Sequence, residues 1–107
     1  MRRGDIVTVA LQGDQGKPRP ALVVQSDLFS ELPAITLLPI TGTMVDAGVF
    51  RVPVAASSQI GLATRSQIMV DKPQTSSRGK VGLVIGHLDD VTIVAVNRAL
   101  AVFLGLA

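Results

Sequence analysis

The sequence predicts a mostly β protein with one C-terminal helix, in which five to seven short strands form a small, strongly bent antiparallel sheet or barrel. Three observations predict this fold class. Short apolar or alternating segments recur along most of the chain, a single long helical pattern follows them, and no repeat or linker interrupts the order. At 107 residues, the chain has the length of a single domain spanning residues 1–107.

Composition excludes several classes of protein. Hydrophobic residues make up 48% of the chain and charged residues 17%, which excludes intrinsic disorder. The mean hydropathy of +0.48 is high, but the most apolar segment, 91–107, carries Asn97 and Arg98 in its middle and is shorter than the roughly 20 residues of a membrane span. We therefore expect no membrane association. The excess apolar surface is instead expected at a subunit interface, most simply that of a homodimer.

The absence of cysteine excludes disulfides, thiolate nucleophiles and cysteine zinc sites. The first residues, Met1 to Asp5, lack the apolar core of a secretion signal, so we expect a cytoplasmic protein. A net charge of +2 is compatible with a polyanionic partner. With no Trp or Tyr and three Phe, a nucleic-acid surface of stacked aromatic rings is not expected.

In the first part of the chain, three segments are predicted strands: Ile6 to Leu11, Pro20 to Gln25 and Ala34 to Ile40. The second is apolar almost throughout, which is typical of a strand buried on both faces. The intervening 12–18 is a polar loop with two glycines and a proline. Ser26 and Asp27 cap a short helical turn that Pro33 stops.

The second part begins with an alternating segment, Phe50 to Val54, in which Pro53 predicts an edge strand. A turn at Gly61 and Leu62 precedes a further strand, Ser66 to Val70, and a polar, flexible stretch follows at 71–80. Whether Val81 to Ile85 forms a strand or a helical turn stays open. Asp89 and Asp90 favour a helix start, and the pattern from Val91 to about Leu104 is apolar nearly all round, so this helix should be buried on most sides until Gly105 stops it.

The most unusual stretch of the sequence runs from Gly16 to Pro20. Two prolines fix the backbone on either side of Arg19. A guanidinium whose position is fixed in this way, beside Lys17, is suited to binding a phosphate. The alternative is a solvated arginine without a ligand, which composition alone slightly favours. Thr41-Gly42-Thr43 ends a buried strand, where a hydroxyl can face a groove or simply close a turn. Residues 71–75 contain a carboxylate, an ammonium and two hydrogen-bonding side chains at the end of a strand, which could bind a ligand. The alternative is an ordinary polar loop with an internal ion pair.

A metal site is not expected. His87, Asp89 and Asp90 lie near a helix start, where capping explains them better, since adjacent side chains diverge. The sequence contains no phosphate-binding glycine loop and no zinc spacing.

Six segments, in order, resemble motifs of the MazF/PemK family of toxin endoribonucleases. They are Gly4-Asp5-Ile6-Val7, Arg19-Pro20-Ala21-Leu22-Val23-Val24, Leu38-Pro39-Ile40-Thr41, Ser66 to Lys72, Ile85 to Asp89, and Leu100 to Leu106. Each motif is weak, but the ordered set covers essentially the whole chain.

The resemblance implies an SH3-like barrel of the MazF/CcdB-like toxin type, whose homodimer forms an RNA-binding groove that a cognate antitoxin covers. It implies cleavage of single-stranded RNA without metal or cofactor, in which the ribose 2′-hydroxyl attacks its own phosphate to leave a 2′,3′-cyclic phosphate and a 5′-hydroxyl. Arg19 and Thr41 fall on catalytic positions, and Asp71 matches a carboxylate that some members use, which makes it the candidate base. The expected RNA-binding residues are Lys17, Pro18, Thr43, Lys72, Gln74 and Arg78.

Two departures from the family pattern concern specificity. Lys72 stands where many members have glutamine, and the loop at 14–17 is short, so the choice of RNA sequence is expected to differ. An alternative is a non-enzymatic toxin on the same fold that poisons DNA gyrase. That alternative does not need Arg19 or Thr41, and the chain lacks the tryptophan that those toxins carry near their end, so the sequence favours the enzyme.

Overall fold

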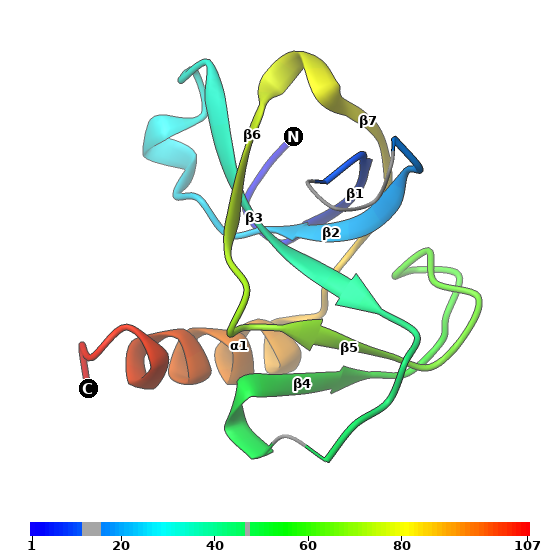
Figure 1. Cartoon of the computed structure of the whole chain (residues 1–107), viewed down its shortest axis with the longest axis vertical. Helices are drawn as coiled ribbons and strands as arrows, with labels where there is room; N and C mark the ends of the chain where they lie inside the picture. The colour runs from blue at the N-terminus through cyan, green and yellow to red at the C-terminus, as the bar shows by residue number, and fades with distance from the viewer. Residues whose placement is uncertain (12–15, 47) are drawn as a thin grey trace.

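The computed structural model describes residues 1–11, 16–46 and 48–107, and Figure 1 shows their arrangement. Strands form most of it, and one helix follows them. The elements are β1 (Asp5–Val9), β2 (Arg19–Val23), η1 (Asp27–Phe29), β3 (Ala34–Thr41), η2 (Gly48–Phe50), β4 (Arg51–Val54), β5 (Ser66–Met69), β6 (Gln74–Ser77), η3 (Arg78–Lys80), β7 (Val81–His87) and α1 (Asp90–Phe103), where η marks a single turn of 3₁₀-helix. The predicted fold class, mostly β with a C-terminal helix, is confirmed.

The sheet is antiparallel, with the strand order β4-β5-β3-β2-β1-β7, and β6 pairs with β3 beside this path. Strand β3 connects two layers because it changes partners along its length (Figure 1): residues 34–37 pair with β6, and residues 40–41 pair with β5. The consecutive strands β6 and β7 bond to different neighbours, β3 and β1, with the turn η3 between them. The sheet is therefore strongly bent but does not close into a continuous barrel.

The core consists of two apolar clusters on opposite faces of the central strands. Neighbouring residues alternate between them: Ile6, Leu22 and Leu38 belong to one cluster, while Val7, Val23 and Leu37 belong to the other. Each central strand is thus buried on both faces, which explains the nearly continuous apolar run after Pro20. Helix α1 covers the first cluster with Val96 and Ala99.

Most predicted elements are present with small shifts at their ends. The turn η1 has Ser26 as its N-cap, with the Leu28 amide donating to Ser26 Oγ at 3.2 Å. Pro53 lies in β4, which is an edge strand, and the undecided segment after Val81 is β7. In the predicted polar loop 12–18, residues 12–15 lie outside the described residues.

The expectation of a flexible stretch at 71–80 is wrong for its middle part. Residues 74–77 form β6, which is in register with β3 from Ala34↔Ser77 to Leu37↔Gln74. The sequence of this strand shows no apolar periodicity. Hydrogen bonds to β3 and the burial of Ser76 hold it in place, rather than apolar side chains.

Helix α1 is well defined at both ends. The Asp89 carboxylate accepts hydrogen bonds from the amide and the hydroxyl of Thr92, and Gly105, at φ +75°, closes the C-terminal end. The expected burial on most sides does not occur within a single chain. Only Val96 and Ala99 are buried, while Val91 is 80% exposed and Val102 is 54% exposed.

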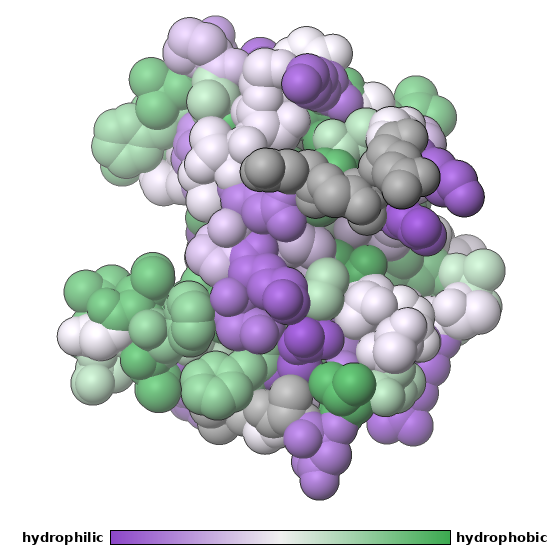
Figure 2. Space-filling model, in the orientation of Figure 1, coloured by the Kyte–Doolittle hydropathy of each residue, from purple (hydrophilic) through white to green (hydrophobic). Residues whose placement is uncertain are grey.

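Exposed apolar side chains gather in two places on the face of the molecule that Figure 2 shows. They cover the C-terminal part of α1 and, separately, η1. No helix in the described part of the chain is long and apolar enough to cross a membrane.

Candidate active site

An open groove of about 720 Å³ lies where the ends of β2, β3, β5 and β7 meet the turns around them. Three kinds of side chain line it: the cations Arg19 and Lys72, the polar side chains Thr41, Thr43, Thr64, Ser66 and Gln74, and apolar groups that include Leu11, Met69 and Ile85. No acidic residue occurs among the lining residues that the structure describes. The groove is therefore suited to an anionic ligand.

Arg19 begins β2, Thr41 ends β3, and both line the groove. The antiparallel register of these strands runs from Val23↔Leu37 to Ala21↔Pro39, and Arg19 and Thr41 each lie two residues beyond its last pair. The Thr43 amide donates to Thr41 Oγ1 at 3.1 Å, which leaves the hydroxyl proton of Thr41 available to donate. A guanidinium and a hydroxyl on facing strands can both donate to one phosphate group.

Lys72 and Gln74 reach the groove from the connection between β5 and β6. Gln74 begins β6 and is registered with Leu37 of β3. Lys72 belongs to the turn before it, which is closed by the Lys72 amide donating to the carbonyl oxygen of Met69 at 3.2 Å. The second cation of the groove is thus supplied by a separate part of the sheet.

The wall formed by residues 61–64 was not predicted to belong to the site. It packs against β7 through two glycines: a Cβ on Gly61 would lie 2.1 Å from the Ile85 carbonyl oxygen, and one on Gly86 would lie 2.0 Å from the Ile60 carbonyl oxygen. The His87 amide also donates to the Gln59 carbonyl oxygen at 3.2 Å. The available sequence signal was the pair of glycines, since glycine at such positions often marks close backbone approach.

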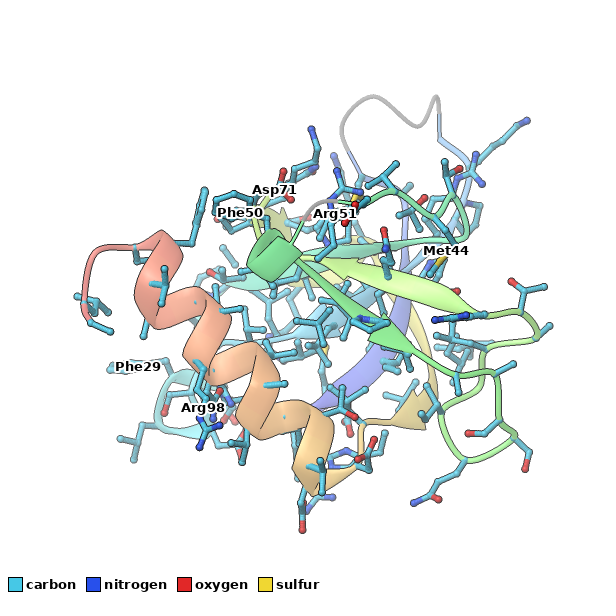
Figure 3. The ribbon with its side chains drawn as sticks, turned by 90° about the horizontal axis from the view of Figure 1, so that it is seen from below. Phe29, Met44, Phe50, Arg51, Asp71 and Arg98 are labelled. Atoms are coloured by element: carbon cyan, nitrogen blue, oxygen red, sulfur yellow. The ribbon has the colours of Figure 1, made fainter. Side chains whose placement is uncertain are left out.

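Four predicted site residues lie outside the groove lining. Lys17 and Pro18 are exposed just before β2. The Asp71 carboxylate accepts a hydrogen bond from Arg51 Nε at 3.2 Å, and Arg78 Nε donates to the Leu32 carbonyl oxygen at 3.1 Å. Figure 3 shows Asp71 beside Arg51 and Phe50, next to η2. The structure therefore brings together Arg19, Thr41, Thr43, Lys72 and Gln74 in the groove, whereas Arg78 lies away from it, beside the start of β3.

His87 and the nearby carboxylates have structural partners. His87 Nδ1 lies 2.8 Å from Asp5 Oδ1, and Asp89 caps α1. Burial raises the pKa of the Asp5 carboxyl, but the hydrogen bond from the Arg2 amide, together with the bond and charge of His87, outweighs burial and holds that pKa below 3.8. Hydrogen bonds from Thr92 likewise lower the pKa of Asp89. Within the described ranges, no three or more His, Asp or Glu side chains gather as metal ligands would.

Comparison with known proteins decides the family. Residues 2–104 match the model of the PemK-like, MazF-like toxins of type II toxin–antitoxin systems. The chain belongs to this toxin family. A curated relative from Mycolicibacterium smegmatis, named a probable endoribonuclease MazF, is 41% identical over 108 residues, which cover 100% of this chain and 99% of that protein.

Solved structures of MazF proteins share the fold. The Mycobacterium tuberculosis toxin MazF-mt6 superposes with a TM-score of 0.82 at 29% identity, covering 96% of this chain and 98% of that one. A mycobacterial endoribonuclease, solved in complex with its cognate antitoxin, gives a TM-score of 0.83 at 21% identity, covering 100% and 97% of the two chains. The likeness to the second protein concerns the fold alone.

Proposed function

We propose that this member of the PemK/MazF family is a toxin that cleaves single-stranded RNA, including mRNA, as a sequence-specific endoribonuclease without a metal ion. One observation carries the proposal: Arg19 and Thr41 line the same groove, whose described lining residues include a second cation, Lys72, and no carboxylate. The relative at 41% identity, named a probable endoribonuclease, supports the same activity.

The proposed reaction is an internal phosphoryl transfer. The ribose 2′-oxygen attacks the adjacent phosphorus, and the bond from phosphorus to the 5′-oxygen of the next nucleotide breaks. A base takes the proton of the 2′-hydroxyl, and the departing 5′-oxygen gains a proton from water. The products are a 2′,3′-cyclic phosphate and a 5′-hydroxyl.

Arg19 and Thr41 have distinct roles in this reaction. The Arg19 guanidinium stabilises the charge that develops on the non-bridging oxygens of the phosphorane, a contribution that grows in the transition state. The Thr41 hydroxyl donates a hydrogen bond to the same group. Because a guanidinium does not release its proton, Arg19 acts as an electrostatic stabiliser rather than as an acid.

Asp71 is the proposed proton acceptor. It lies in the turn between two groove residues, Met69 and Lys72, and it is the carboxylate nearest to them in sequence. Its carboxylate is 30% exposed and is held by Arg51. In the proposed complex, Lys17, Pro18, Thr43, Lys72, Gln74 and Arg78 contact the RNA around the scissile phosphate.

The proposed assembly uses the exposed face of α1. A second copy of the chain covers apolar side chains such as Val102, and the homodimer extends the groove across both subunits. A cognate antitoxin binds this toxin and blocks RNA, as the complex of the structurally similar mycobacterial endoribonuclease suggests. The proposed location is the cytoplasm, where the RNA substrate is.

The decisive experiment incubates the purified protein with a long single-stranded RNA in EDTA and maps the new ends. Arg19→Ala is the test variant, and Lys80→Ala, an exposed cation of η3 outside the groove lining, is the matched control. We expect discrete cuts with 5′-hydroxyl ends for the wild type and for Lys80→Ala, and cutting reduced at least about 10²-fold for Arg19→Ala. Absent cutting, or equal cutting by all three proteins, refutes the proposal and moves the test to a binding toxin, with gyrase as its first target.

A further inference from the structure

The Arg51–Asp71 pair connects the edge strand of the sheet to the rim of the groove. Arg51 begins β4, and Asp71 belongs to the turn between β5 and β6; Nε of the arginine lies 3.2 Å from Oδ1 of the aspartate. In the β4–β5 register Arg51 is the partner of Met69, which lines the groove. The pair therefore lies beside Met69, next to the segment from which Met69 and Lys72 extend into the groove.

Because Arg51 is largely buried, its pairing with Asp71 matters for the structure. Its side chain is 15% exposed, and a guanidinium removed from water to this extent is costly unless it is paired. Asp71 supplies that pairing, and in return its turn gains a fixed point outside the groove. A surface ion pair with both side chains in water would hold the turn much less firmly.

Backbone hydrogen bonds and one buried side chain also hold this turn. The Val70 amide donates to the Phe50 carbonyl oxygen at 3.0 Å, and the Lys72 amide donates to the Met69 carbonyl oxygen at 3.2 Å. Val70 is buried in the core, whereas the Lys72 side chain is exposed. The side chain of Asp71, between them, adds a link from the turn to β4, where Arg51 holds its other end.

We propose that Arg51 is a positioning residue for RNA: through Asp71 it fixes the turn 70–73, and thereby the placement of Lys72 and Gln74 in the groove. The inference rests on the proposed ribonuclease function and deepens it. Arg51 itself lies outside the groove lining and contacts no substrate in this role. Loss of Arg51 should weaken RNA binding through Lys72 and Gln74, and it should also slow the chemical step through Asp71, the proposed proton acceptor.

The test compares Arg51→Gln, Arg51→Lys and Lys80→Gln on a short RNA with one cleavage site. Lys80 is the control because it is an exposed cation of η3, outside the groove lining and away from α1. We expect Arg51→Gln to raise KM roughly 10- to 100-fold and also to lower kcat, because Asp71 loses its partner, and Arg51→Lys to restore most of both losses. Lys80→Gln should keep the wild-type KM, and thermal melting with gel filtration checks that all three variants fold and assemble as the wild type does.

Hydrogen exchange supplies a readout that does not depend on cleavage. In Arg51→Gln the amides of residues 69–74 should exchange faster, while protection elsewhere should stay as in the wild type. Lys80→Gln should keep wild-type protection throughout. An unchanged KM together with unchanged exchange overturns the inference. A fall in kcat at constant KM also overturns it, because Lys72 and Gln74 would then hold RNA as in the wild type. If the wild type cuts no RNA, the proposed function fails, but hydrogen exchange still tests the positioning role. In that case, exchange of residues 69–74 in Arg51→Gln at the wild-type rate overturns the positioning role.

Discussion

The Asp5 carboxylate and the His87 imidazole, 2.8 Å apart, join the first residue of β1 to the last residue of β7. The two residues are also Cα partners in the β1–β7 register, and the Arg2 amide donates to the second carboxylate oxygen of Asp5. A single buried carboxylate thus ties the N-terminal segment to the edge strand β7.

This arrangement makes stability depend on acid pH. The pKa of Asp5 in the folded chain lies below 3.8, so its contribution to stability is complete above the unfolded value and is lost as pH falls through the lower, folded value. The free energy of unfolding of the wild type should therefore decrease more steeply than that of Asp5→Asn below about pH 5. Urea melts from neutral to acid pH measure this difference. Glu31→Gln, at an exposed position, should follow the wild type, and a wild-type slope in Asp5→Asn would contradict the expectation.

Gly86 holds the far wall of the groove against β7. Gly86→Ala forces a Cβ against the Ile60 carbonyl oxygen, so the backbone must move, and we expect a loss of about 1–3 kcal/mol together with impaired RNA cleavage. Thermal unfolding measures the first effect. Gly79→Ala is the matched control, because a Cβ there meets nothing within 4 Å, and an equal melting temperature for the two variants would show that the wall is not rigid.

Thr41 should act through its hydroxyl proton. Thr41→Val keeps the shape of the side chain but removes the hydroxyl, which donates to the phosphate in the proposed reaction and accepts a hydrogen bond from the Thr43 amide. We expect kcat to fall about 10²-fold. Thr41→Ser retains both and should stay within about tenfold of the wild type. Single-turnover cleavage of a short RNA separates this change from binding, and comparable rates for valine and threonine would remove Thr41 from the chemistry.

Lys72 should contribute charge to RNA binding without taking part in the chemistry. Lys72→Gln also restores the residue that many family members carry, so its cleavage sites are expected to shift. Its affinity for single-stranded RNA should fall, and the slope of log K against log salt should decrease by about 0.7, the value for one lost contact. Lys80→Gln should leave that slope unchanged, and fluorescence anisotropy over a salt series decides between the two results.

A charge introduced on the exposed face of α1 should weaken assembly of the homodimer. Val102→Asp, or a charge at Ala101, places a carboxylate on the apolar surface assigned to the second subunit, so dimerisation and RNA cleavage should weaken together. Analytical ultracentrifugation measures the dissociation constant. Leu83→Asp places the same charge on an exposed apolar position of β7 and should leave it unchanged. A dimer insensitive to Val102→Asp would place the interface elsewhere.

The sequence by itself determined the local structure wherever one physical effect dominated. Four features depend on neighbours within a few residues, so pattern and propensity were sufficient to predict them: the apolar run after Pro20, the proline in an edge strand, the Ser26 cap, and the two aspartates at the start of α1. Strand β6 was missed because its polar side chains carry no periodicity, and its pairing with β3 is a contact between segments far apart in sequence.

Tertiary structure decided which residues share the groove. The sequence singled out Arg19 and Thr41 separately, but only the pairing of β2 with β3 brings the strand ends that carry them to one groove. Asp71 was selected by type and motif, whereas its contact with Arg51 depends on how β4 lies against β5. Such contacts follow from strand register and packing, which are set by the whole core, and local sequence therefore cannot specify them.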